Sequence, residues 1–228
     1  MHAGEARHPS TTSNQTSLTG LDSAMSACLE IISVASTSRF TPPADQQEND
    51  DYLVRSYSAK LALLVHALTD DTSTLATDTQ SNKAALAFGL YDQLVRLPAL
   101  IHRGIPVFSD ELYKQFSVQP QELAKHIRVA DSSDTPSLKS IPIVTENTGR
   151  QSLLSHAVLR AYEAAKDATE DTDTQKKYRH GTTIPLWRLL VLRQQQLGLW
   201  QRKQPDLLRE KMTLTPIAKL YSAWKNKR

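Results

Sequence analysis

Residues 84–123, AALAFGLYDQLVRLPALIHRGIPVFSDELYKQFSVQPQEL, decide the fold of this chain. The first part has apolar residues at helical spacing, through Leu90 and Leu94. The pattern stops at Pro98, because proline lacks the N–H that a helix interior requires, and it resumes near Asp110. The stretch therefore predicts a helix, a loop and a second helix.

The rest of the chain repeats the helical pattern. Apolar residues recur every three or four positions in five further segments, namely 21–34, 52–68, 152–169, 183–202 and 214–224. Alternating β-branched runs are almost absent, and the segment 141–144, IPIV, is too short and too broken by proline to found a sheet. The sequence predicts an all-α fold.

Polar segments divide the chain without separating it into domains. Residues 1–20 are rich in Ser and Thr and predict a disordered tail, while residues 21–228 are long enough for a single helical domain. Residues 41–51 predict a polar linker, and residues 130–148 predict a long loop. Cys28 is the only cysteine, which fits a reducing compartment. No apolar run reaches the roughly 20 residues that span a bilayer, so we expect any membrane contact to be peripheral.

The charge is unevenly distributed. From Lys176 onward there are 13 Lys and Arg residues against two acids, a net charge of +11, whereas the first 175 residues have 14 against 22, a net charge of −8. A basic half can steer association with nucleic acid, anionic lipid or an acidic protein surface. The same residues also fit the solvated faces of helices, so both interpretations stay open.

One motif in residues 84–123 has a family resemblance. Gly89, Gln93 and Arg96 precede an Arg-Gly turn at Gly104. This order resembles the squalene/phytoene synthase family, in which a Gly-x-x-x-Gln-Leu helix leads into an aspartate-rich motif and an Arg-Gly turn. The Leu-Pro step at Pro98, the histidine that follows it, and the closing segment 214–224 are similar to the branch of the family that contains mitochondrial complex I assembly factors. The resemblance covers residues 52–228.

The resemblance implies a prenyl-synthase-like helical bundle with a shortened N-terminal part. Prenyl coupling requires Mg²⁺ held by two facing sets of carboxylates. Where the synthases have aspartates after the arginine, this chain has Leu97, Pro98, Ala99 and Leu100. Three other acidic groups lie at 50–51, at 70–78 and at 167–173, and we expect them to be solvated caps or loops. Asp167, Glu170 and Asp171, with helical spacing, are the best metal candidate among them. We predict no catalytic, metal or cofactor residue.

The functional expectation follows from the family. The resemblance implies a pseudoenzyme that acts by protein binding, as an assembly factor or accessory subunit of a mitochondrial complex. Because the similar branch contains complex I assembly factors, the resemblance implies complex I. It further implies a matrix location, with peripheral contact to the inner membrane. Two alternatives stay open. The chain could be an active Mg²⁺-dependent prenyl transferase, or an RNA-associated mitoribosomal protein that uses its basic C-terminal half.

Two sets of residues are the candidate sites. The first is the degenerate motif: Gly89, Gln93, Arg96, Pro98 and His102. Arg96 is either a vestige of diphosphate recognition or a partner of a neighbouring carboxylate, and we expect His102 to hydrogen-bond a carbonyl freed at the Pro98 break. The second is a partner surface. Because tryptophan and arginine are enriched at binding hot spots, we assign to it Arg193, Trp200, Arg202 and Lys203.

Overall fold

The structure, a computed structural model, describes residues 43–69, 81–124, 147–179 and 181–208, with a few positions within 25–33 and 214–219. These residues form helices and connecting turns, with no strand in the described part, so the all-α prediction is confirmed. The expected tail at 1–20 lies outside the described residues. So do most of the loop at 130–148 and most of the expected segments 21–34 and 214–224. Among the described helices none is both long and apolar enough to cross a bilayer.

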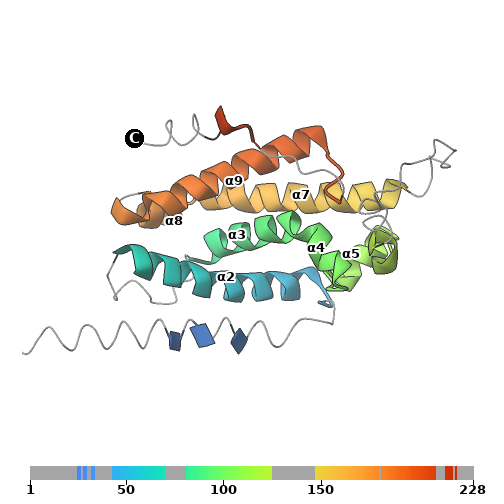
Figure 1. The fold of residues 1–228 in the computed structure, drawn as a ribbon, viewed down its shortest axis with the longest axis horizontal. Helices are drawn as coiled ribbons and strands as arrows, with labels where there is room; N and C mark the ends of the chain where they lie inside the picture. Colours follow the sequence, from blue (N-terminus) through green and yellow to red (C-terminus); the bar gives the residue numbers. More distant parts are fainter. Residues whose placement is uncertain are drawn as a thin grey trace, which may run out of the picture.

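Four long helices make the body of the molecule (Figure 1). They are α2 (Gln46–Thr69), α3 (Ser81–Val95), α7 (Asn147–Glu170) and α9 (Ile184–Lys203). α3 lies in the middle, with α2 against one side of it and α7 and α9 against the other. Shorter helices connect them: α4 (Leu97–His102), α5 (Asp110–Gln115) and α8 (Thr172–Tyr178), the last followed by a 3₁₀ turn at Gly181–Thr183.

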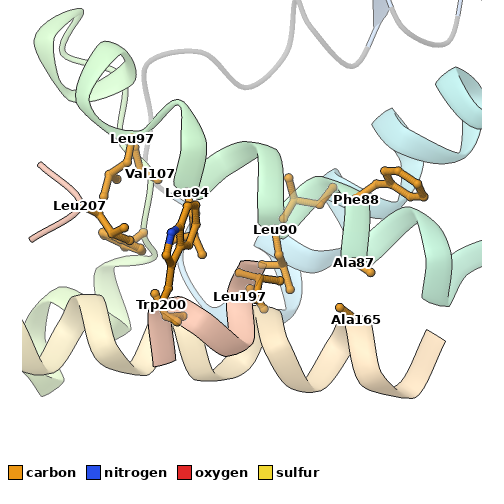
Figure 2. Packing of buried hydrophobic residues seen from close by; sticks show 14 of the residues in the cluster. Ala87, Phe88, Leu90, Leu94, Leu97, Val107, Ala165, Leu197, Trp200 and Leu207 are labelled. Carbon is orange, nitrogen blue, oxygen red and sulfur yellow. The ribbon is translucent and has the colours of Figure 1, made fainter. Parts of the chain in front are cut away.

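The core is centred on α3, because neighbours cover it on both sides. Leu90 and Leu94 of α3 lie beside Leu197 and Trp200 of α9, as Figure 2 shows. Nearer the start of α3, Ala87 faces Ala165 of α7, as Figure 2 also shows. Ala84 and Ala87 are almost completely buried, as is Ala165 of α7, and small side chains let two helices pack closely.

Gly89 permits the close approach of α2 and α3. A Cβ atom at this position would lie 3.0 Å from Cβ of Leu53 and 3.1 Å from Cδ2 of Tyr57, both on α2. These distances are shorter than ordinary van der Waals contacts, so with any larger residue these atoms of α2 would have to shift by a few tenths of an ångström. The glycine that begins the family-like motif therefore has a packing role in this fold.

α2 begins at Gln46, within the predicted linker, which corrects that boundary. The side chain of Asp45 accepts a hydrogen bond from the Glu48 backbone N–H at 2.8 Å, and the Glu48 carboxylate accepts one from the Ala44 N–H at 2.7 Å. This reciprocal pair resembles a capping box, which satisfies N–H groups that the first turn of a helix leaves unpaired. The prolines at 42 and 43 come before the cap, so they do not interrupt the helix.

The predicted helix, loop and helix at 84–123 is present, with one addition. α3 ends at Val95, and a new helix, α4, begins at Leu97. Pro98 lies in the first turn of α4, where its missing N–H costs no hydrogen bond. Gly104 then adopts a left-handed conformation with φ of 70°, and Ser109 caps α5 by accepting a hydrogen bond from the Leu112 N–H.

Candidate functional site

A polar network crosses the bundle at Asp92 of α3. One carboxylate oxygen lies 3.0 Å from a guanidinium nitrogen of Arg193 on α9, and the other accepts a hydrogen bond of 3.0 Å from the Tyr57 hydroxyl on α2. About four-fifths of both charged side chains is buried. We call Tyr57, Asp92 and Arg193 the Asp92 network. It ties three helices together through one carboxylate.

Aromatic rings enclose the arginine of this network. The guanidinium carbon of Arg193 lies 4.4 Å from the centre of the Phe88 ring and 4.7 Å from that of Tyr91. Tyr91 in turn stacks on Trp200, with ring centres 5.8 Å apart and planes only 4° from parallel. A cation over aromatic faces is attracted by the ring quadrupole, and the attraction grows when water is excluded. Arg193 is therefore held by a carboxylate and two rings at once.

The electrostatic state of the network follows from its burial. Burial and the neighbouring Asp92 carboxylate raise the pKa of the Tyr57 hydroxyl well above its usual value, so it stays protonated and donates to Asp92. Burial lowers the pKa of the Arg193 guanidinium, and Asp92 opposes that shift. The pKa of Lys60 is also lowered, by burial first and then by Arg96. Lys60 lies over the Tyr57 ring, its nitrogen 4.0 Å from the ring centre.

Gln93, the next residue of α3, makes a second polar connection. Its Nε2 donates to the carbonyl of Val107 at 2.5 Å and lies 3.4 Å from Oδ1 of Asn49 on α2. Val107 belongs to the buried segment between α4 and α5. The glutamine thus fixes α3 against the chain that follows it and against α2, and its polar atoms are used in holding the fold.

Several other carboxylates of the body also contact cations or helix ends. Asp50 of α2 forms an ion pair with Arg160 of α7, and burial outweighs the arginine's attraction, so the pKa of Asp50 is raised. Asp206 lies 3.3 Å from the buried Arg150. Asp171 caps α8 and pairs with Lys83 at 2.6 Å. Within the described residues, no three His, Cys, Asp or Glu side chains are grouped closely enough to hold a metal ion.

The acidic groups weighed from the sequence have separate positions. The hydrogen bond from Lys83, followed by those from the N–H and the hydroxyl of Thr174, lowers the pKa of Asp171 to about 2. Glu170 pairs with Lys166, and Asp173 pairs with Lys176. The acids at 70, 71 and 78 lie outside the described residues. The helical spacing of Asp167, Glu170 and Asp171 is interrupted at Asp171, where α7 ends and α8 begins.

The five residues of the degenerate motif do not converge on one cavity. Gly89 is buried between α2 and α3, and Gln93 is half-buried and makes the contacts described above. Arg96 is exposed at the turn between α3 and α4, and Pro98 is in the first turn of α4. His102 is exposed at the last position of α4. Only the first two residues of the motif therefore act inside the bundle.

The four residues assigned to a partner surface divide into two pairs. Arg202 and Lys203 are exposed at the end of α9. Trp200 is only 4 % exposed and stacks on Tyr91, and Arg193 is enclosed in the Asp92 network, so neither contributes to an exposed surface. This corrects the sequence-based assignment for Arg193 and Trp200. The assignment of Arg202 and Lys203 stays a prediction.

Sequence reasoning missed Asp92 and Tyr57, the two partners of Arg193. The sequence did contain a signal for them, namely the spacing of Arg193 from the apolar residues of its own helix. On α9, Arg193 follows Leu190 by three positions and precedes Leu197 by four, so it lies on the buried stripe. A charge on such a stripe requires a buried partner of opposite sign, and Asp92, four positions after the buried Phe88, has the same phase on α3.

Comparison of the chain with protein-family models, curated proteins and solved structures finds no match.

Proposed function

We propose that this chain is a non-catalytic protein with a squalene/phytoene-synthase-like bundle, which acts by binding other proteins. Its role is that of an assembly factor or accessory subunit of a mitochondrial complex, and the family-like motif suggests complex I. Its place is the matrix, with peripheral contact to the inner membrane. The support for this proposal comes from the motif residues quoted above and from the use that the bundle makes of the helix that contains them.

The observation that carries the proposal is the role of α3. In a prenyl synthase, the corresponding helix needs carboxylates that face a cavity and hold Mg²⁺. Here the one carboxylate of α3, Asp92, is used by Tyr57 and Arg193, and the amide of Gln93 is used by Val107. These groups stabilise the packing of α3 instead of facing a substrate. Because the polar side chains of α3 are used in packing contacts, we favour a scaffold function over a catalytic one.

The competing enzymatic function has a direct test. Purified protein is incubated with farnesyl or geranylgeranyl diphosphate and Mg²⁺, and products are measured by mass spectrometry. We expect no turnover above the rate without protein. Turnover that is lost in Asp167→Ala, but kept in Asp173→Ala as a matched change in the next helix, would establish the enzyme and overturn the proposal.

The binding role is tested in the cell. Tagged full-length chain is purified from mitochondria under mild detergent, and the complex that comes with it is identified and quantified. We expect stoichiometric recovery of subunits of one respiratory-chain complex, and loss of that complex when the chain is depleted. Recovery of the chain alone, with the complex unaffected by depletion, would reject the role.

A second candidate is supported by the exposure of Arg202 and Lys203 at the end of α9, ahead of a basic C-terminal segment. This surface suits RNA as well as protein. Binding to RNA through phosphate contacts weakens steeply with salt, because condensed counterions are released. A measured affinity that does not change between about 50 and 200 mM salt would reject the RNA function.

A further inference from the structure

α7 and α9 lie side by side (Figure 1). The seam between them contains a cavity of about 240 Å³. Its lining includes buried apolar side chains, with two less buried residues of α7 beside them: Leu154, Val158, Trp200, Pro205, Ser155 and Leu159. Leu159 is 38 % exposed, which is high for a leucine in a packed helix. The tryptophan expected on the surface therefore forms part of the wall of a cavity.

A second, more open hollow of about 570 Å³ continues along the same seam. Tyr162 of α7 and Gln194 and Arg202 of α9 contribute to its lining, and Gln201 lines both hollows. The first hollow is mainly apolar, and the second has a mixed polar and apolar lining that includes one cation, Arg202, and an apolar residue after α9, Leu214. From Gln151 in the first hollow to Tyr162 in the second, α7 extends roughly 16 Å at 1.5 Å per residue.

We propose that this seam binds a short acidic segment of a partner protein, which inserts one bulky apolar side chain into the cavity beside Trp200. Acidic residues of the same segment then lie against Arg202 and Lys203. The inference rests on the proposed function and names the kind of partner that the protein-binding role requires. The groove is long enough for about three turns of helix, or about five residues of extended chain.

The size of the cavity matches a single side chain. A cavity of about 150 Å³ with an apolar lining is known to accept a benzene molecule, whereas drug-sized ligands need roughly 300 Å³ or more. At about 240 Å³, the cavity beside Trp200 lies between these values. A buried apolar anchor within a polar surround is the usual arrangement of a binding hot spot. Gln151 and Gln204 supply such a surround, and the Gln151 amide donates to the Gln204 carbonyl at 3.1 Å.

The charges beside the seam indicate which kind of partner segment it binds. Arg202 is exposed and lines the second hollow, Lys203 is the next exposed residue of α9, and Nε of Arg202 donates to the Gly198 carbonyl on its own helix. The acid that follows, Asp206, is already occupied by Arg150. The chain's own segment after α9 reaches the second hollow at Leu214, but residues 209–228 contain six Lys and Arg residues against one Glu, so the charge of this segment has the same sign as the surface. An acidic partner segment is complementary, and a basic one is repelled.

The test uses photo-crosslinking from the seam in the full-length chain. Benzoylphenylalanine replaces Leu159, and a control chain has it at Leu64, an apolar residue of α2 that is 48 % exposed on the other side of the bundle. After irradiation in cells that produce the chain, crosslinked peptides are mapped by mass spectrometry. We expect position 159, but not 64, to crosslink to one segment that contains a bulky apolar residue flanked by acids.

Charge reversal and a synthetic peptide complete the test. Arg202→Glu with Lys203→Glu should lower the crosslink by about tenfold or more, whereas Lys114→Glu, an exposed change on α5, should leave it unchanged. A synthetic copy of the mapped segment should lose about tenfold or more in affinity when its apolar residue becomes alanine. Thermal unfolding of each variant shows that the fold is kept.

Other outcomes overturn the inference. These are crosslinks to residues 209–228 of the same chain, to a second copy, to lipid or to a basic segment, and no crosslink from position 159. Insensitivity to the charge reversal also rejects it. If the tagged chain still recovers its complex in these cases, the proposed function stands and the partner binds elsewhere. If it recovers nothing, the proposed function fails with the inference.

Discussion

Asp92 and Arg193 form an ion pair across the bundle, with oxygen and nitrogen 3.0 Å apart and about four-fifths of each side chain buried. A buried pair is weak evidence for net stability, because removing two charges from water costs nearly as much as their attraction gains. Its importance lies in its geometry. The pair is made only when α3 and α9 have their native positions, so it favours one arrangement of the helices over others.

Replacing one partner of this pair should therefore lower the free energy of unfolding more than replacing both partners. In Asp92→Leu, the guanidinium of Arg193 stays between Phe88 and Tyr91 without a carboxylate, and we expect the free energy of unfolding to fall by about 3 kcal/mol. The double variant Asp92→Leu with Arg193→Met should recover most of the loss, since methionine also packs well against aromatic rings. Urea unfolding of the wild type, of Asp92→Leu, of Arg193→Met and of the double variant measures the coupling. Additive losses in the double variant would contradict the pairing.

Gly89 gives the second prediction. Gly89→Ala places a Cβ 3.0 Å from that of Leu53, so the packing of α2 against α3 must shift by a few tenths of an ångström. We expect this overpacking to cost about 1–3 kcal/mol, offset by about 1 kcal/mol of better helix propensity. We expect a net loss of about 1 kcal/mol in urea unfolding. Gly198→Ala is the matched control, because its Cβ would meet only the Tyr162 ring, at 3.3 Å. That variant should be unchanged or slightly more stable. Equal effects of the two changes would refute the packing role of Gly89.

Long periodic helices were predictable from the sequence, because burial of one stripe is a local pattern. The helix expected at 183–202 is observed as Ile184–Lys203, and that expected at 152–169 as Asn147–Glu170. The start of α2 was not predictable from periodicity, because the Asp45 and Glu48 cap lies in a polar segment that resembles a linker. A closer reading of the Asp-x-x-Glu spacing could have found it.

The candidate site was less accessible to sequence reasoning. Arg193 was assigned to a partner surface because arginine is enriched at binding hot spots. Its burial depends on Asp92 and two aromatic rings that lie far away in the sequence, and only the folded bundle brings them together. Trp200 was assigned to the same surface because tryptophan is also enriched at binding hot spots. It follows Leu197 by three positions, so it shares the buried stripe of α9.

Acid sensitivity is the third prediction. Lys83 and Thr174 lower the pKa of Asp171 to about 2, below its ordinary 3.8. A carboxylate with a lowered folded-state pKa stabilises the protein above its ordinary pKa, and this contribution is lost as the pH falls from about 4 to about 2. Asp171→Asn keeps an acceptor for the Thr174 N–H but has no charge to lose. Thermal unfolding from about pH 7 to pH 2 should therefore decline less steeply in the variant over that interval. Parallel curves would show that the charge of Asp171 is not coupled to folding.

Trp200 gives the last prediction, which separates a core role from a surface role. Trp200→Ala removes the ring stacked on Tyr91 and enlarges the adjacent cavity, and we expect it to lower the free energy of unfolding by about 3–5 kcal/mol. Arg202→Ala and Lys203→Ala change exposed residues of the same helix, so each should stay within about 0.5 kcal/mol of the wild type. Urea unfolding followed by circular dichroism measures all three. A Trp200→Ala variant as stable as the wild type would place the indole in solvent, and the cavity beside it would then lose the wall on which partner binding depends.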